Sequence, residues 1–163
     1  MAIEVYRIDD RLVHGQVVVG WGQPLRLAFV VLVDDDVAAS EWEQDLYRMG
    51  VPPEMRIHFE TVASALTRLP EYQRMTQPGL LLTGDTATMR RLVEGGAAGI
   101  SRVNIGGVHH RADRVPRMRY VFLTPGEEAD LQAIAARGIE VTAQDLPSAS
   151  TVSLADVLVG HGA

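Results

Sequence analysis

The chain has 163 residues, of which 47% are hydrophobic and 22% charged, so it is long enough for one domain with a sizeable core and has an ordinary globular composition. Its net charge of −6 argues against a nucleic-acid partner, which would need a basic face to displace counterions. Cysteine and lysine are both absent, which excludes disulfides, thiolate metal sites and every mechanism that requires a lysine amine.

The N-terminus does not combine a basic segment with a long apolar run, so no signal peptide is expected. The longest strongly apolar run, residues 27–33, is far too short to cross a bilayer. We therefore expect a cytoplasmic protein. No linker, internal repeat or low-complexity segment is visible, and we expect residues 1–163 to form a single domain.

Predicted strands and helices alternate along the first half of the chain. Residues 27–33 form the continuous apolar run of a strand that is buried on both faces of a parallel sheet. Ser40 and Glu43 have the spacing of a capping box, which predicts a helix from there to Met49. The other expected elements are a strand at 2–8, a helix at 15–21, a solvated acidic turn at 34–36, a strand at 55–59 and a helix at 61–69 ended by Pro70.

The second half continues the same alternation. Thr124, Pro125 and Glu127 are typical of a helix start, because threonine caps, proline fits the first turn and glutamate completes a capping box. The expected elements are strands at 79–83, 99–105, 119–123 and 139–142, helices at 86–94 and 124–137, and a short helix opening at 153–156.

This alternation predicts an α/β fold with an open, mainly parallel central sheet of about six or seven strands and helices on both faces. In such folds ligands bind beyond the carboxyl ends of the strands, where the strand order reverses. The loops expected at that edge are residues 9–15, 34–36, 84–86 and 106–111.

The loop after the first strand is crowded with reactive groups. His14 stands at a predicted helix start, three residues after Arg11. A neutral histidine is nucleophilic, and an arginine beside it can hold a phosphoryl group by paired hydrogen bonds. We therefore predict that His14 accepts and donates a phosphoryl group as a phosphohistidine and that Arg11 clamps it. The backbone amides expected to cradle the anion are those of Gly15, Gln16 and Val17.

Three carboxylates are expected to support this site. Asp9 or Asp10 would hold Arg11 or orient the imidazole, and the sequence does not decide between them. Asp34, at the end of the second strand, is expected near the pocket. No metal or cofactor is expected, since arginine and backbone amides supply the positive charge.

The residues alone leave other interpretations to be weighed, and for His14 the structural one is about as good as the chemical one. His14 as a simple helix cap, with Arg11 paired to a neighbouring aspartate, would explain the charges without chemistry. His109 and His110 do not have a metal-binding spacing and are taken as loop histidines, with a contact to phosphate left open. A phosphorelay receiver would need a lysine to accompany its acidic cluster. Of the two remaining histidines, His58 is expected to be a structural residue in a strand, and His161 is expected to belong to the C-terminal tail.

The run from Arg7 to Val17 (RIDDRLVHGQV) resembles the active-site signature of the IIB component of the mannose/fructose/sorbose class of bacterial sugar phosphotransferase systems. The likeness extends over essentially the whole chain. It continues in residues 31–38, 49–53, 103–107, 138–141 and 152–158. The family's phosphorylated histidine falls on His14, and its neighbouring arginine falls on Arg11.

The resemblance implies a cytoplasmic phosphotransferase that acts transiently at the inner face of the membrane. It would take a phosphoryl group from the phosphohistidine of a separate IIA protein and pass it to a sugar bound by the membrane components IIC and IID. The chain departs from relatives in lacking lysine and in carrying Val-His-His-Arg at 108–111. These departures leave a second hypothesis, a regulatory or phospho-sensing module on the same fold that does not take part in transport.

Overall fold

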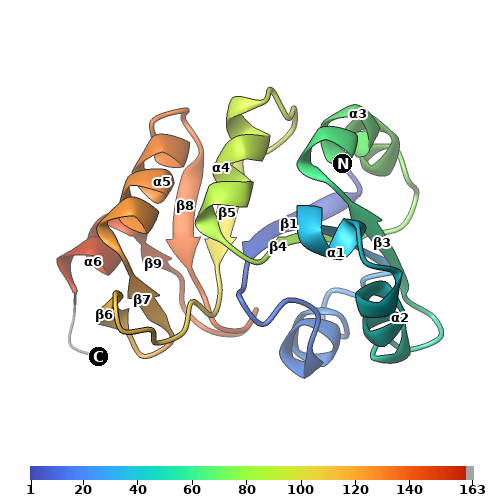
Figure 1. Cartoon of the computed structure of the whole chain (residues 1–163), viewed down its shortest axis with the longest axis horizontal. Coiled ribbons are helices and arrows are strands. Elements are labelled where there is room, and N and C mark those ends of the chain that lie inside the picture. Colours follow the sequence, from blue (N-terminus) through green and yellow to red (C-terminus); the bar gives the residue numbers. More distant parts are fainter. Residues whose placement is uncertain (161–163) are drawn as a thin grey trace.

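The computed structural model describes residues 1–160, and it confirms the predicted α/β architecture (Figure 1). A seven-stranded sheet has the order β3-β2-β4-β1-β5-β8-β9, in which all neighbouring pairs are parallel except β8 and β9. Two further strands, β6 and β7, form a separate antiparallel pair. The strands are β1 (Ile3–Ile8), β2 (Phe29–Val33), β3 (Arg56–Glu60), β4 (Gly79–Thr83), β5 (Arg102–Ile105), β6 (Val115–Met118), β7 (Val121–Leu123), β8 (Glu140–Ala143) and β9 (Val152–Ser153).

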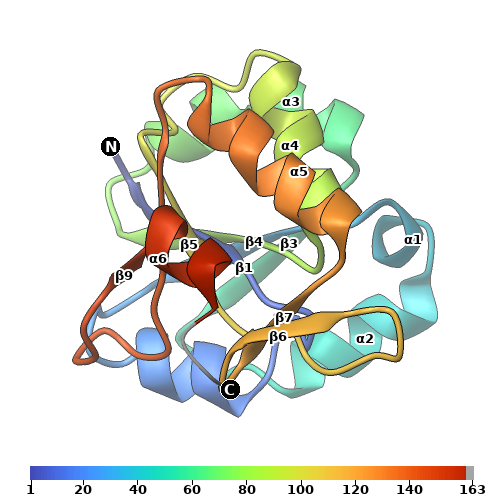
Figure 2. The same ribbon diagram turned by 90° about the vertical axis from the view of Figure 1, so that its left-hand side faces the viewer.

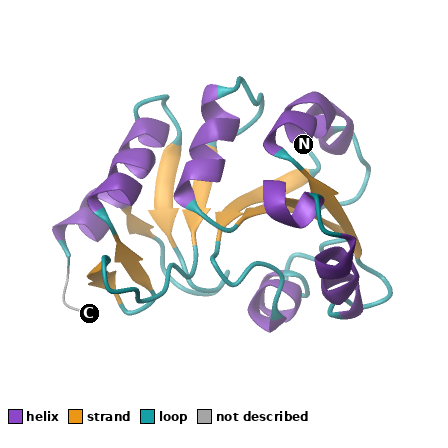
Figure 3. Cartoon of the chain, viewed as in Figure 1, coloured by secondary structure: helices purple, strands orange, loops and turns teal. Residues whose placement is uncertain are grey.

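Helices cover both faces of the sheet (Figure 3). One face packs against α3, α4, α5 and α6, and the other packs against a short π-helix, η1, and the side chain of Val37 from α1. The helices are η1 (Gln16–Trp21), α1 (Asp35–Ala38), α2 (Glu41–Met49), α3 (Val62–Gln73), α4 (Thr86–Glu94), α5 (Pro125–Ala135) and α6 (Leu154–Val159).

Strand β2 shows why a continuous apolar run predicts a central strand. Val31 and Val33 join the core beneath α3 and α4, while Val30 and Leu32 join the core beneath η1. Successive side chains of a strand point to opposite faces, so both sets must be apolar when both faces are covered.

The prediction that Pro70 ends a helix was wrong, because α3 continues to Gln73. The last turn is stabilised by tertiary contacts. Tyr72 is fully buried and donates a hydrogen bond of 2.9 Å from its hydroxyl to Glu60. The stabilisation from this packing offsets the loss of the backbone hydrogen bond that proline cannot form.

Several short elements were not predicted. The acidic turn at 34–36 begins α1, because the Asp34 carboxylate accepts a hydrogen bond from the Val37 amide and caps the helix. The strands β6 and β9 were also missed, and the strand expected at 119–123 begins only at Val121. Pro116 interrupts the pattern of β6, and β9 spans only two residues, so neither has a periodic signal of its own. The helix expected at 15–21 is present in π form, with the Gly22 amide bonded to the Val17 carbonyl at 2.9 Å.

The chain reverses direction across the sheet at β1. After β1 it builds β2, β3 and β4 on one side, and it then crosses to β5 on the other. The segments that follow β1 and β5 therefore meet at the carboxyl edge, where the Asp10 amide donates to the Gly107 carbonyl at 2.8 Å (Figure 2). This is the topological position at which parallel α/β folds bind ligands.

Candidate active site

Asp9, the first residue after β1, is the electrostatic centre of the edge. Its side chain is fully buried and accepts hydrogen bonds from the Arg11 amide at 3.1 Å and from Nε and Nη2 of Arg11 at 3.2 Å each. Burial by itself would raise the pKa of Asp9. The contacts with His14 and Arg11, together with the charge of Arg7, outweigh burial and hold that pKa well below its usual range. Asp9 is therefore a carboxylate at every pH near neutrality.

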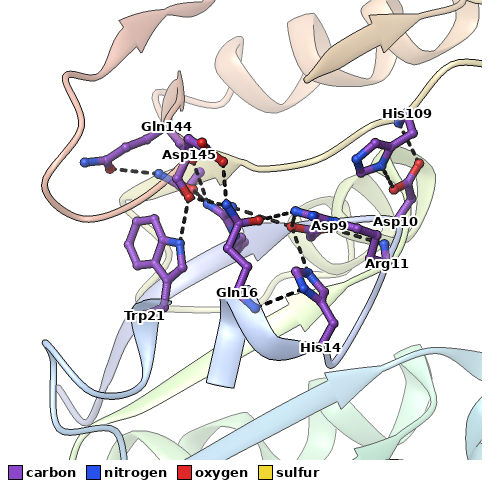
Figure 4. Close-up of polar contacts among 11 residues, drawn as sticks. Asp9, Asp10, Arg11, His14, Gln16, Trp21, His109, Gln144 and Asp145 are labelled. Atoms are coloured by element: carbon purple, nitrogen blue, oxygen red, sulfur yellow. Dashed lines mark hydrogen bonds and ion pairs between the residues drawn. The ribbon is translucent and has the colours of Figure 1, made fainter. Parts of the chain in front are cut away.

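His14 is fixed between this carboxylate and the start of η1 (Figure 4). Its Nε2 lies 3.4 Å from Asp9 Oδ2, and its Nδ1 accepts a hydrogen bond of 3.2 Å from the Gln16 amide. A neutral imidazole has one N–H and one lone pair, so these contacts assign the proton to Nε2 and the lone pair to Nδ1.

Arg11 lies beside the imidazole with its side chain 39% exposed. Besides Asp9, its guanidinium contacts the side-chain oxygen of Gln16. The side-chain amide nitrogen of the same Gln16, Nε2, donates to Asp145 Oδ1 at 2.5 Å. Gln16, which the sequence suggested only for its backbone, thus also links Arg11 to the loop after β8 through its side chain.

The helix start next to His14 is open. A Cβ added to Gly15 would meet nothing within 4 Å. Among the described residues, the amides of Gly15 and Val17 have no hydrogen-bond partner, whereas the Val18 amide is bonded to the His14 carbonyl. Two free N–H groups and a half-exposed guanidinium thus border His14.

Arg7 is the site residue that sequence reasoning missed. It is fully buried, bonds the side-chain oxygen of Asn104 and the carbonyl of Gln144 through Nη1, and lies 3.5 Å from Asp9 Oδ2. Its guanidinium also lies 4.7 Å from the centre of the Trp21 ring. Burial lowers the pKa of Arg7, and the carboxylates of Asp9 and Asp145 oppose that effect.

The two glycines after β5 make room for these arginines. A Cβ on Gly106 would come within 2.4 Å of the Arg7 guanidinium. A Cβ on Gly107 would come within 2.4 Å of the His109 ring and 3.2 Å of Arg11 Nη2. Two features of the sequence could have indicated that Arg7 is buried at the site. One is the arginine inside an apolar strand, and the other is the Gly-Gly pair after another strand.

Asp10 makes no contact with the His14 imidazole in the hydrogen bonds and ion pairs of the described residues, and instead anchors the loop after β5 that carries His109. It accepts hydrogen bonds from the His109 amide at 2.7 Å and from Arg114 at 3.3 Å, and it contacts His109 Nδ1 at 2.5 Å. Arg114 is held in turn by both oxygens of Glu127, at 2.9 and 2.7 Å. The geometry therefore separates the two aspartates: Asp9 faces His14, and Asp10 anchors the loop that carries His109.

The other described residues singled out in the sequence make no hydrogen bond or ion pair with His14. Asp34 caps α1 and makes no hydrogen bond to residues 9–17 in the described part of the chain. His58 packs against the rings of Phe29 and Tyr72, and His110 packs edge-on against Phe122. His161 lies outside the described residues.

Residues 1–160 contain no group of three or more acidic or histidine side chains arranged to bind a metal ion. No helix in this range has the length and apolar character needed to span a membrane.

Known proteins resemble this chain over nearly its whole length. The family described as PTS system sorbose subfamily IIB component matches residues 3–162. The mannose-specific EIIAB component of Escherichia coli K12 is 30% identical over 97% of the chain, which spans about half (49%) of that protein. The N-acetylgalactosamine-specific IIB component 1 of the same strain is 33% identical over 86% of the chain and 89% of its own length.

Solved structures share the fold along the whole chain. The IIBSor domain of the sorbose permease from Klebsiella pneumoniae superposes with a TM-score of 0.87 at 26% identity, covering 99% of each chain. Together with the family match, this confirms the resemblance seen in the RIDDRLVHGQV run. The chain belongs to the sorbose subfamily of IIB components of the sugar phosphotransferase system.

Proposed function

We propose that Nδ1 of His14 carries a phosphoryl group from a IIA phosphohistidine to a sugar during its uptake. The observation that carries this proposal is the pair of contacts on the imidazole. Asp9 holds the Nε2 side, so the lone pair of Nδ1 is directed toward the open helix start. The relatives named for mannose, N-acetylgalactosamine and sorbose systems favour this function over a regulatory module that does not take part in transport.

The first step is an in-line displacement at phosphorus. The hydrogen bond from the Gln16 backbone amide to His14 Nδ1 opens, and the freed lone pair forms a bond to phosphorus. At the same time the donor's N–P bond breaks and its electron pair returns to the donor imidazole. His14 keeps its Nε2 proton and gains positive charge on the ring, which the Asp9 carboxylate stabilises at 3.4 Å. Arg11 binds the phosphoryl oxygens, and the free amides of Gly15 and Val17 add two N–H donors.

The second step reverses these roles. A sugar hydroxyl oxygen attacks phosphorus, the Nδ1–P bond breaks, and the electron pair returns to His14, while the hydroxyl proton leaves to a base outside this chain. No metal is required, since arginine and N–H groups neutralise the charge of the transferred group. The protein would act on the cytoplasmic side, alternating between the IIA donor and the membrane components IIC and IID.

Phosphorylation from labelled phosphoenolpyruvate, with the general phosphotransferase proteins and a IIA donor, tests this proposal. The wild type should acquire acid-labile phosphate, and nitrogen NMR should place it on Nδ1. The variant His14→Ala should acquire none, and His109→Ala should remain labelled as a matched control. Equal labelling of His14→Ala, or phosphate on Nε2, would contradict the proposal.

A further inference from the structure

Helix α2 carries an apolar stripe that no residue of the described range 1–160 covers. Trp42, Leu46 and Met49 are 71%, 50% and 82% exposed, and their spacing places them on one side of the helix. No residue of α2 is buried. An exposed tryptophan flanked by two other large apolar side chains is typical of a protein–protein contact and not of a solvated helix.

The stripe ends beside a groove that leads back to the active-site helix. Gly50 and Val51, which follow α2, line one wall of a groove of about 670 Å³, and Val18 and Val19 of η1 line another. Val19 is itself 53% exposed. Because η1 begins two residues after His14, this groove reaches the helix that directly follows the reactive imidazole.

Charge decides what can occupy this surface. The segment from Asp34 to Met49 holds six acidic residues and one arginine. Asp35 is paired with Arg91 and Asp45 with Arg48, while Asp34 caps α1. The other three carboxylates make no ion pair within residues 1–160, so the surface remains acidic; they are Asp36, Glu41 and Glu43. The anionic lipids of a cytoplasmic leaflet would repel it, and a second copy would bring like charges together. A basic amphipathic segment would complement both the apolar stripe and the carboxylates, and the cytoplasmic segments of membrane proteins carry an excess of lysine and arginine.

We propose that the α2 surface, defined as Trp42, Leu46, Met49 and Val19, docks the basic cytoplasmic face of the membrane-embedded sugar-transport partner. This inference rests on the proposed function and adds the location of the contact. Docking on α2 and η1 holds the His14 loop against the partner that binds the sugar, and it leaves His14 and Arg11 free for the phosphoryl group.

The double variant Trp42→Gln/Leu46→Gln tests the proposal, with Val159→Gln as a matched control. Val159 is 68% exposed and lies on α6, at the opposite end of the sheet. Binding of each unphosphorylated chain to inside-out vesicles containing IIC and IID is measured first. We expect the double variant to bind about tenfold more weakly and the control to bind like wild type. Wild-type binding should weaken as salt increases.

Transfer assays on the same proteins locate the defect. The double variant should accept phosphate from the IIA donor at the wild-type rate and need about tenfold more protein for half-maximal transfer to sugar. Unchanged vesicle binding, equal binding to protein-free vesicles, or a loss confined to the donor step would each overturn the proposal. Failure of His14 to accept phosphate in the wild type would instead overturn the proposed function, since vesicle binding is measured without phosphate.

Discussion

The buried carboxylate of Asp9 faces Nε2 of His14 at 3.4 Å, so Nδ1 is the imidazole atom with the lone pair, which accepts the Gln16 backbone amide. Asp9 is itself paired with Arg11 at 3.2 Å and lies 3.5 Å from buried Arg7. Two arginines therefore fix the carboxylate, and the carboxylate fixes the histidine. The neighbouring Asp10 has no part in this arrangement, because it is bonded to His109 and Arg114.

Replacing Asp9 by asparagine should slow phosphorylation of His14 by about 10²- to 10⁴-fold, because the amide neither fixes the Nε2–H tautomer nor stabilises the charged ring. The same change leaves Arg7 buried without its nearest carboxylate and should lower the free energy of unfolding by about 3 kcal/mol. Rapid-quench labelling and urea unfolding measure the two effects. Asp10→Asn is the matched control, and a rate loss as large as that of Asp9→Asn would contradict the separate roles.

Acid stability should depend on Asp9. Its pKa is lowered in the folded chain from an ordinary value of 3.8, so between the two values the unfolded state binds more protons than the folded state. The stabilisation is fully present above the ordinary pKa and is lost as pH falls through the folded one. Urea unfolding of wild type between pH 5 and pH 2 should therefore show a steeper loss than that of Asp9→Asn. Parallel curves would show that Asp9 makes no such contribution.

Arg11→Ala should slow phosphoryl transfer by about 10²- to 10³-fold, since it removes a charge that interacts with the transferred group. Stability should change little, because the side chain is 39% exposed and belongs to neither apolar core. Arg11→Lys should recover only part of the rate, as an ammonium lacks the planar pair of donors. Single-turnover rates with the IIA donor provide the measurement, and wild-type rates for Arg11→Ala would remove Arg11 from the mechanism.

Two glycine substitutions should differ in their effect on the stability of the fold. Gly106→Ala places a methyl group 2.4 Å from the Arg7 guanidinium and should destabilise the fold by about 1–3 kcal/mol. Gly15→Ala meets nothing within 4 Å and has a helical backbone, so stability should be unchanged or slightly higher. If a phosphoryl group occupies the space beside Gly15, transfer by this variant should still slow. Thermal unfolding and single-turnover labelling of both variants distinguish these outcomes.

The alternation of apolar runs with capped helices was sufficient to predict the parallel sheet, because periodicity and capping are local properties of the chain. The same reasoning failed where tertiary contacts decide. Pro70 remains in α3 because Tyr72 is buried against Glu60, and β9 exists only because β8 offers it an edge. The π form of η1 likewise has no local signature in a run of valines.

At the site, the sequence by itself determined that histidine, arginine and carboxylates share one loop after a buried strand, and the family signature followed from that spacing. Only the tertiary structure decided that Asp9 contacts His14 while Asp10 binds His109. It also decided that Arg7 is buried next to Asp9. The reason is physical. Arg7, the neighbouring residues Asn104 and Gly106, and Asp145 come from three distant parts of the sequence and meet only when β1, β5 and β8 form one sheet edge. A buried arginine is stable only with such partners around it, and no local pattern records them.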